Sequence, residues 1–70
     1  MKNLKLGKYK HFRGKICKVI GIAKHSETLE EMVVYLELEN NEMWVRPLKM
    51  FIEKVELNGK KVSRFEYIGE

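Results

Sequence analysis

The chain has 70 residues, of which 44% are hydrophobic and 34% are charged, and its formal net charge is +4 at pH 7. This length excludes two independent hydrophobic cores, because even a single domain of roughly 60 residues buries only about 60% of its surface on folding. The one cysteine, Cys17, excludes an internal disulfide and a zinc site made of cysteines. The composition therefore predicts one small domain without a deep cavity, and we expect no cofactor in it.

The charge is distributed unevenly along the chain. Residues 1–25 contain eight basic and no acidic side chains, whereas residues 26–70 contain six basic side chains and ten acidic ones, all glutamate. The absence of aspartate excludes Asp-containing catalytic triads and Asp-rich metal loops. No apolar run approaches the ~20 residues that cross a bilayer, and the first six residues lack the apolar stretch of a signal peptide. We therefore expect a cytoplasmic protein of bacterial type with no membrane contact, consisting of a basic extension (1–6) and one domain (7–70).

The first third of the domain predicts two strands. The segment Lys8–Arg13, bracketed by Gly7 and Gly14, is typical of a short strand whose lysines face solvent. The next segment, Ile16–Ala23, is apolar on both of its faces, which indicates a long strand that is covered on both sides. Gly21 within it predicts a bulge or a sharp bend, which would let a small sheet curl.

The middle of the chain is compatible with a helix or with a hairpin. After the polar loop Lys24–Glu30, the spacing of apolar residues over Leu29–Leu36 fits one face of a helix. The same stretch is rich in strand formers, however, and Leu36–Glu39 alternates. A turn at residues 40–41 would then lead into a second alternating stretch, Met43–Arg46. We favour the hairpin because it accounts for both stretches and for the turn.

The last third predicts a helical turn followed by a hairpin. Pro47 cannot donate a hydrogen bond to a neighbouring strand, but it suits the start of a helical turn over Leu48–Phe51. Strands are expected over Ile52–Leu57 and Val62–Ile68, joined by the strong hairpin signal Asn58-Gly59. The whole pattern predicts an all-β fold, a small barrel of about five short strands with one short helical turn.

Three polar side chains suggest chemistry without specifying it. His11, His25 and Glu27 could in principle hold a metal, but their spacing matches no metalloenzyme motif. The run His25-Ser26-Glu27 could suggest nucleophilic catalysis, but adjacent residues rarely form a catalytic triad. We therefore interpret the loop residues as side chains that cap backbone N–H groups, and we expect no metal site and favour a protein that is not an enzyme.

Trp44 and Arg46 share one face of their predicted strand, opposite Met43 and Val45. If Met43 and Val45 fill the core, Trp44 and Arg46 are exposed together, which is typical of a contact hot spot. Alternatively, Trp44 is the main core aromatic and Arg46 pairs with a glutamate such as Glu37 across the hairpin. The sequence leaves both interpretations open.

The basic first third also has two interpretations. Lysines on short strands protect sheet edges from aggregation. They could instead contact the phosphates of a nucleic acid while aromatic side chains stack on bases, although no base-reading motif occurs. The residues that would serve this second function are Lys8, Lys10, Arg13, Lys15 and Lys18.

Several ordered motifs resemble one small bacterial family, known as domain of unknown function sixteen fifty-three. The motifs are GKYKHFRG (7–14), AKHSET (23–28), WVRPL (44–48) followed by MF (50–51), and RF (64–65). The resemblance covers Gly7 to Ile68 and implies an SH3-like β-barrel, either as a stand-alone cytoplasmic protein or as a module attached to other domains. It implies no established activity. The chain departs from the family pattern at Cys17, where tyrosine is frequent, and at Ser63, where proline is common.

Together these observations predict a non-enzymatic binding module. Its groove would recognise a protein segment or a small anionic ligand by aromatic contact and charge, and the alternative is nucleic-acid binding through the basic third. A hydrolase-type activity at His25 and Glu27 ranks last. No motif identifies the ligand or the oligomeric state. The ligand-binding residues that we expect are Tyr9, His11, His25, Glu27, Trp44 and Arg46.

Overall fold

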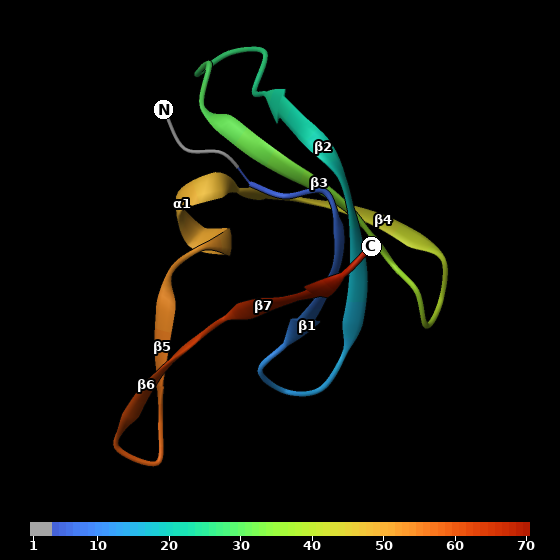
Figure 1. Cartoon of the computed structure of the whole chain (residues 1–70). Coiled ribbons are helices and arrows are strands. Elements are labelled where there is room, and N and C mark those ends of the chain that lie inside the picture. The colour runs from blue at the N-terminus through green and yellow to red at the C-terminus, as the bar shows by residue number, and fades with distance from the viewer. Residues whose placement is uncertain (1–3) are drawn as a thin grey trace.

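The structure is a computed structural model that describes residues 4–70. Over these residues the chain forms seven strands and one helical turn, drawn in Figure 1. In chain order they are β1 (Gly7–His11), β2 (Ile16–Lys24), β3 (Glu31–Glu37), β4 (Glu42–Pro47), α1 (Leu48–Phe51), β5 (Lys54–Leu57), β6 (Lys60–Ser63) and β7 (Phe65–Gly69).

Five of the strands form one antiparallel sheet in the order β4-β3-β2-β1-β7, and β5 pairs with β6 in a separate ribbon. The predicted all-β class, the β3–β4 hairpin and the helical turn at Leu48–Phe51 are thereby confirmed. The predicted strand Ile52–Leu57 corresponds to β5, which lies in the ribbon and not in the main sheet. The predicted strand Val62–Ile68 breaks at Arg64, and its two halves, β6 and β7, pair with different partners, β5 and β1.

A bulge bends the longest strand at the predicted glycine. Val19 of β2 pairs with Tyr35 of β3, but the next pair is Gly21 with Val34, so Ile20 is an extra residue in the ladder. An extra residue increases the local twist of its strand. The bulge therefore helps the β2–β3 hairpin to curve, as Figure 1 shows.

One face of the sheet carries the core. Tyr9, Cys17, Val19, Val33 and Tyr35 project from β1, β2 and β3 into this inner face, and each is at most 8% exposed. Leu48 and Phe51 of α1 cover it, and Phe65 and Tyr67 of β7 pack against the cluster. Because α1 has only four residues, nearly all of its contribution to the core comes from these two side chains.

The phenyl ring of Phe51 is the centre of this cluster. It is 1% exposed and stacks on Phe65, with ring centroids 4.1 Å apart and planes 3° apart. Tyr9 and Tyr35 contact it from the sheet, with centroid distances of 5.4 Å and 5.7 Å. The ring therefore joins the helical turn to strands from both halves of the chain.

The predicted N-terminal extension, residues 1–6, is described only from Leu4 onward; its first three residues lie outside the described part. Leu4 packs against the core, and the carbonyl oxygen of Lys5 accepts a 2.7 Å hydrogen bond from the Tyr9 hydroxyl. The Lys5 ammonium lies 5.1 Å from the centroid of the Tyr67 ring. Residues 4–6 therefore contact the domain. In residues 4–70, the only helix is α1, far too short to span a bilayer.

Truncating the Phe51 ring should destabilise the domain strongly. We expect Phe51→Ala to lower the free energy of unfolding by about 3–5 kcal/mol, because the ring is fully buried. Met50→Ala is the matched control in the same turn: its side chain is 42% exposed, so the change should be less than about 1 kcal/mol. Urea unfolding followed by circular dichroism measures both. Equal losses in the two variants would contradict the central position of Phe51.

Candidate functional site

A hollow of about 210 Å³ opens on the inner face beside the β1–β2 turn. All five strands of the main sheet and the β1–β2 turn contribute its lining, so it does not belong to any one motif of the sequence. The lining residues are His11, Arg13, Lys15, Ile16, Cys17, Tyr35, Glu37, Arg46 and Phe65. We call this hollow the basic pocket.

The β1–β2 turn holds His11 in place at the pocket. The backbone N–H of His11 donates to the Lys15 carbonyl at 2.7 Å, and the Gly14 N–H donates to the His11 carbonyl at 2.7 Å. Gly14 has φ +102°, which residues with a side chain rarely adopt. The His11 Nδ1 accepts the Arg13 backbone N–H at 3.1 Å. An imidazole whose Nδ1 accepts a hydrogen bond carries its proton on Nε2, so neutral His11 is left with one N–H donor.

Arg46 enters the pocket from β4. Its guanidinium carbon lies 5.7 Å from the centroid of the Phe65 ring, and Phe65 also makes an edge contact with His11 at 4.9 Å. The Nε of Arg46 is buried and has no hydrogen-bond partner among residues 4–70. Among the salt bridges of residues 4–70, none involves Arg46. The predicted alternative, in which Arg46 pairs with Glu37, is therefore wrong: Glu37 lies opposite Glu42 in the ladder, four positions away from Arg46.

The electrostatics of the pocket favour a negative ligand. Arg13, Lys15 and Arg46 line it, whereas its one carboxylate is Glu37, whose Oε2 lies 4.0 Å from the Lys15 ammonium. Burial, followed by the nearby charges of Arg64, Arg46, Arg13 and Lys15, lowers the pKa of His11 below its ordinary value. A bound anion would offset this repulsion between cations.

The pocket provides no activated nucleophile. Burial, and to a lesser extent the Glu37 carboxylate, raises the pKa of the Cys17 thiol to about 11. At neutral pH the sulfur is therefore protonated, and a protonated thiol is a poor nucleophile. Cys17 is 4% exposed and packs in the core cluster. The side chains of the basic pocket can donate hydrogen bonds to a ligand and attract it if it is negatively charged.

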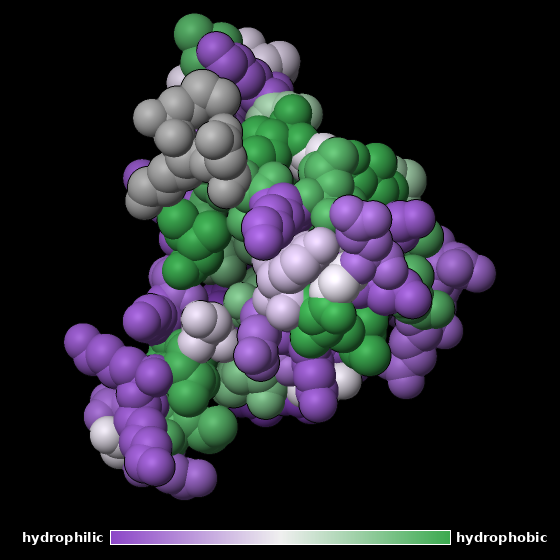
Figure 2. All heavy atoms as spheres, in the orientation of Figure 1, coloured by the Kyte–Doolittle hydropathy of each residue, from purple (hydrophilic) through white to green (hydrophobic). Residues whose placement is uncertain are grey.

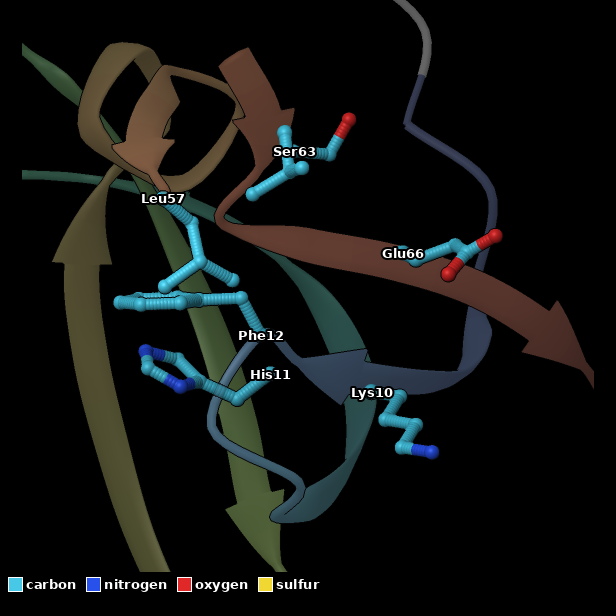
Figure 3. A pocket seen from close by; sticks show the side chains of 7 residues that line it. Lys10, His11, Phe12, Leu57, Ser63 and Glu66 are labelled. Atoms are coloured by element: carbon cyan, nitrogen blue, oxygen red, sulfur yellow. The ribbon is translucent and has the colours of Figure 1, made fainter. Parts of the chain in front are cut away.

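A second hollow of about 450 Å³ lies between the β5–β6 ribbon and β1. Figure 3 shows Leu57 of the ribbon against the Phe12 ring, which in turn lies beside the His11 ring at 4.6 Å between centroids. Figure 2 shows the same ribbon with hydrophilic atoms along its outer edge and hydrophobic atoms toward the rest of the molecule. Its lining combines apolar and polar side chains, so this hollow provides both kinds of contact next to the basic pocket. The apolar residues are Phe12, Leu57 and Val62, and the polar or charged ones are Lys10, His11, Ser63 and Glu66.

The structure brings together two of the six predicted ligand residues, His11 and Arg46, in the basic pocket. Trp44 lies two positions from Arg46 on the same face of β4 and is 49% exposed. Tyr9, in contrast, is 5% exposed within the aromatic core, so the expectation that it lines a groove is wrong. Tyr9 shares a face of the sheet with its cross-strand neighbours Tyr67 and Cys17, and Leu48 and Phe51 of α1 cover that face.

His25 and Glu27 lie elsewhere, in the loop between β2 and β3. His11 lies near the first residue of β2, and His25 follows the last residue of that strand. The length of β2, about 27 Å for an extended strand, therefore separates the two histidines. The Nδ1 of His25 accepts the backbone N–H groups of Glu27 and Thr28 at 3.1 Å and 3.3 Å. These bonds match the capping function that we expected of this loop. A metal site shared by His11, His25 and Glu27 is excluded by the distance.

The basic residues of the nucleic-acid alternative divide into two groups. Arg13 and Lys15 line the basic pocket. Lys8 and Lys18 are directly paired on β1 and β2, and they share the outer face of the sheet with Lys10. The Lys15 ammonium also lies 3.8 Å from Glu39.

Tyr35, Glu37 and Phe65 are pocket residues that we did not expect. Tyr35 and Glu37 alternate on β3 with the same parity as the core residue Val33, which was a usable signal once the strand was assigned. Phe65 had no such signal, because its contact with Arg46 depends on how β7 returns to the sheet beside β1.

Acid should destabilise the domain partly through His11. Its pKa is lowered in the folded state, so between that value and the unfolded value of about 6.5 the unfolded chain binds more protons. The free energy of unfolding should therefore fall as the pH decreases through this range. We expect the free energy of unfolding of the wild type to fall relative to that of His11→Asn as the pH is lowered from about 7.5 to 5. A difference that does not change with pH would contradict the cationic surroundings of His11.

A family profile for the protein of unknown function DUF1653 matches residues 7–67. A crystal structure of a DUF1653 protein from Bordetella bronchiseptica superposes with a TM-score of 0.88 and 31% sequence identity, covering 96% of this chain and 90% of that one. No curated protein matches the chain. With a profile match over most of its length and a close structural relative, this chain belongs to the DUF1653 family.

Proposed function

We propose that this protein is a binding module that holds a small anionic group, a phosphate or a carboxylate, in the basic pocket. The observation that carries this proposal is the Arg46 guanidinium, which is partly buried in a cation-lined pocket without a carboxylate partner. A buried polar group that lacks a partner costs about 1–3 kcal/mol, and more when it is charged. An anionic ligand would remove this cost.

The surroundings of Arg46 orient it for such a ligand. Its guanidinium lies over the Phe65 ring, and an aromatic face holds a planar cation without using its N–H donors. Pro47 follows it and restricts its backbone to extended conformations. A guanidinium held in this way presents paired donors to the oxygens of a phosphate or carboxylate.

Neighbouring side chains complete the expected recognition. Arg13 and Lys15 add charge at the turn, and the Nε2 N–H of His11 adds a donor. The apolar side chains of the second hollow, Phe12, Leu57 and Val62, would accommodate an uncharged part of the same ligand. This two-part surface favours a ligand with one anionic end over a bare ion.

Nucleic-acid binding is a second candidate, and one observation supports it. Lys8 and Lys18 face each other directly across β1 and β2, with Lys10 on the same face. Like charges in direct opposition are destabilising in a sheet, and a phosphate backbone would relieve the repulsion. Such binding should weaken steeply with salt, whereas the pocket ligand should respond weakly because its contacts are partly buried.

An NMR titration of the isotope-labelled protein with inorganic phosphate, and a separate one with succinate, test the basic pocket. We expect saturable amide shifts at the β1–β2 turn and β4, together with an upward shift of the His11 pKa, because a bound anion favours the imidazolium. The His25 resonances are the internal control, since this residue lies outside the pocket. If neither anion produces saturable shifts there, the proposal is wrong.

Two charge-neutralising variants separate specific binding from attraction to a basic protein. Arg46→Gln should weaken binding by about 10- to 150-fold, the loss of a charge-assisted hydrogen bond. Lys8→Gln removes the same charge from the outer face and should leave the affinity within about twofold. Equal weakening in the two variants would show that only net charge matters. Shifts with single-stranded DNA that are confined to Lys8, Lys10 and Lys18 would favour the second candidate.

A further inference from the structure

Strand β4 forms an edge of the main sheet and leaves apolar side chains uncovered on both of its faces. Within the described part of the chain, its one ladder partner is β3. Met43 and Val45 are 60% and 59% exposed on the outer face, and Trp44 is 49% exposed on the inner one. The interpretation in which Met43 and Val45 fill the core is therefore wrong, and so is the one in which Trp44 is the main core aromatic. The reason is that Phe51 and Tyr35 fill the inner face and nothing in residues 4–70 extends the sheet beyond β4.

An edge of this kind normally requires protection. Proteins blunt exposed edges with lysine, proline, bulges or covering segments. The centre of β4, Met43-Trp44-Val45, has none of these, and Pro47 lies at its end. The unpaired backbone groups of such a strand can bind another strand.

We propose that β4 is the interface of a homodimer in which the β4 strands of two copies pair antiparallel about a two-fold axis at Trp44. In this register the two Trp44 residues lie opposite each other. Met43 of each copy then lies opposite the partner's Val45, and Glu42 lies opposite the partner's Arg46. The two five-stranded sheets would form one continuous sheet.

Charge complementarity selects this register. Glu42, Trp44 and Arg46 share the inner face of β4, because they pair in turn with Glu37, Tyr35 and Val33. Strand pairing about Trp44 therefore places opposite charges face to face at both ends of the interface, on one side of the sheet. Within residues 4–70, neither Glu42 nor Arg46 makes a salt bridge in its own chain. Shifting the register by two residues would place Trp44 opposite Arg46 and leave Glu42 without a charged partner.

The two-fold arrangement also satisfies the requirement for closure. Pairing β4 with the other edge, β7, would be head-to-tail and would continue into a filament. Pairing β4 with itself buries both copies of the exposed strand and stops at two chains. The interface shares Arg46 with the proposed anion site, and a guanidinium has five N–H donors, so it can contact a ligand and a neighbouring carboxylate together. Glu42 does not line the basic pocket, so Glu42→Arg tests the interface without changing a residue of that pocket.

A charge-swap series in analytical ultracentrifugation tests this register. We expect the wild type to dimerise, and we expect Glu42→Arg or Arg46→Glu alone to weaken dimerisation by about tenfold or more, because each places like charges opposite each other. The double variant, carrying both substitutions, should restore it. Glu66→Arg is the control, because it introduces the same charge change on the other edge strand, β7. Circular dichroism verifies that each variant is folded.

Trp44, the single tryptophan of the chain, gives a second readout. Its fluorescence should shift to the blue as the protein is concentrated, and Val45→Lys should abolish the shift without unfolding the exposed strand. A Kd of about 1 mM corresponds to a binding free energy of only about 4 kcal/mol. A wild type that is still monomeric at about 1 mM protein would therefore overturn the proposal. So would a dimer that the charge swaps do not affect.

Discussion

The stack between Phe51 and Phe65 is the contact on which the rest of the structure depends. A five-stranded sheet has an inner face that must be covered, and in residues 4–70 this chain has only four helical residues to cover it. Phe51 reaches from the helical turn into the middle of that face, and Phe65 lies flat against it from β7 at 4.1 Å. Without the stack, the helical turn would be anchored in the core by Leu48 alone, and β7 would keep only the contact of Tyr67 with Tyr9.

Phe65 also connects the core to the basic pocket. One face of its ring packs on Phe51, and its surroundings include His11 at 4.9 Å and the Arg46 guanidinium at 5.7 Å. The positions of the two groups that would donate to an anion are therefore set by a core residue. On the edge strand β4 this arrangement leaves Met43, Trp44 and Val45 exposed, and these are the side chains that the proposed dimer would cover.

Local patterns were sufficient to predict most of the elements. Alternation located the strands, Pro47 the start of the helical turn and Gly21 the bulge. The break at Arg64 was not predicted, because it depends on contacts with distant residues: the Arg64 carbonyl accepts the Phe12 N–H and its guanidinium binds Glu53 at 2.9 Å. The site was predicted in part. His11 and Arg46 were identified by residue type, but their meeting follows from sheet order, and the exposure of Trp44 follows from the edge position of β4, neither of which alternation encodes.

A double-mutant cycle between Phe51→Leu and Phe65→Leu tests the central claim most directly. The free energies of unfolding of the wild type, the two single variants and the double variant give the coupling between the rings. If the stack holds the two halves of the fold together, the coupling should be about 0.5–1.5 kcal/mol, as expected for an aromatic pair beyond its buried area. Single-variant losses that add to within about 0.3 kcal/mol would show that the rings are stabilised independently, and would contradict this account.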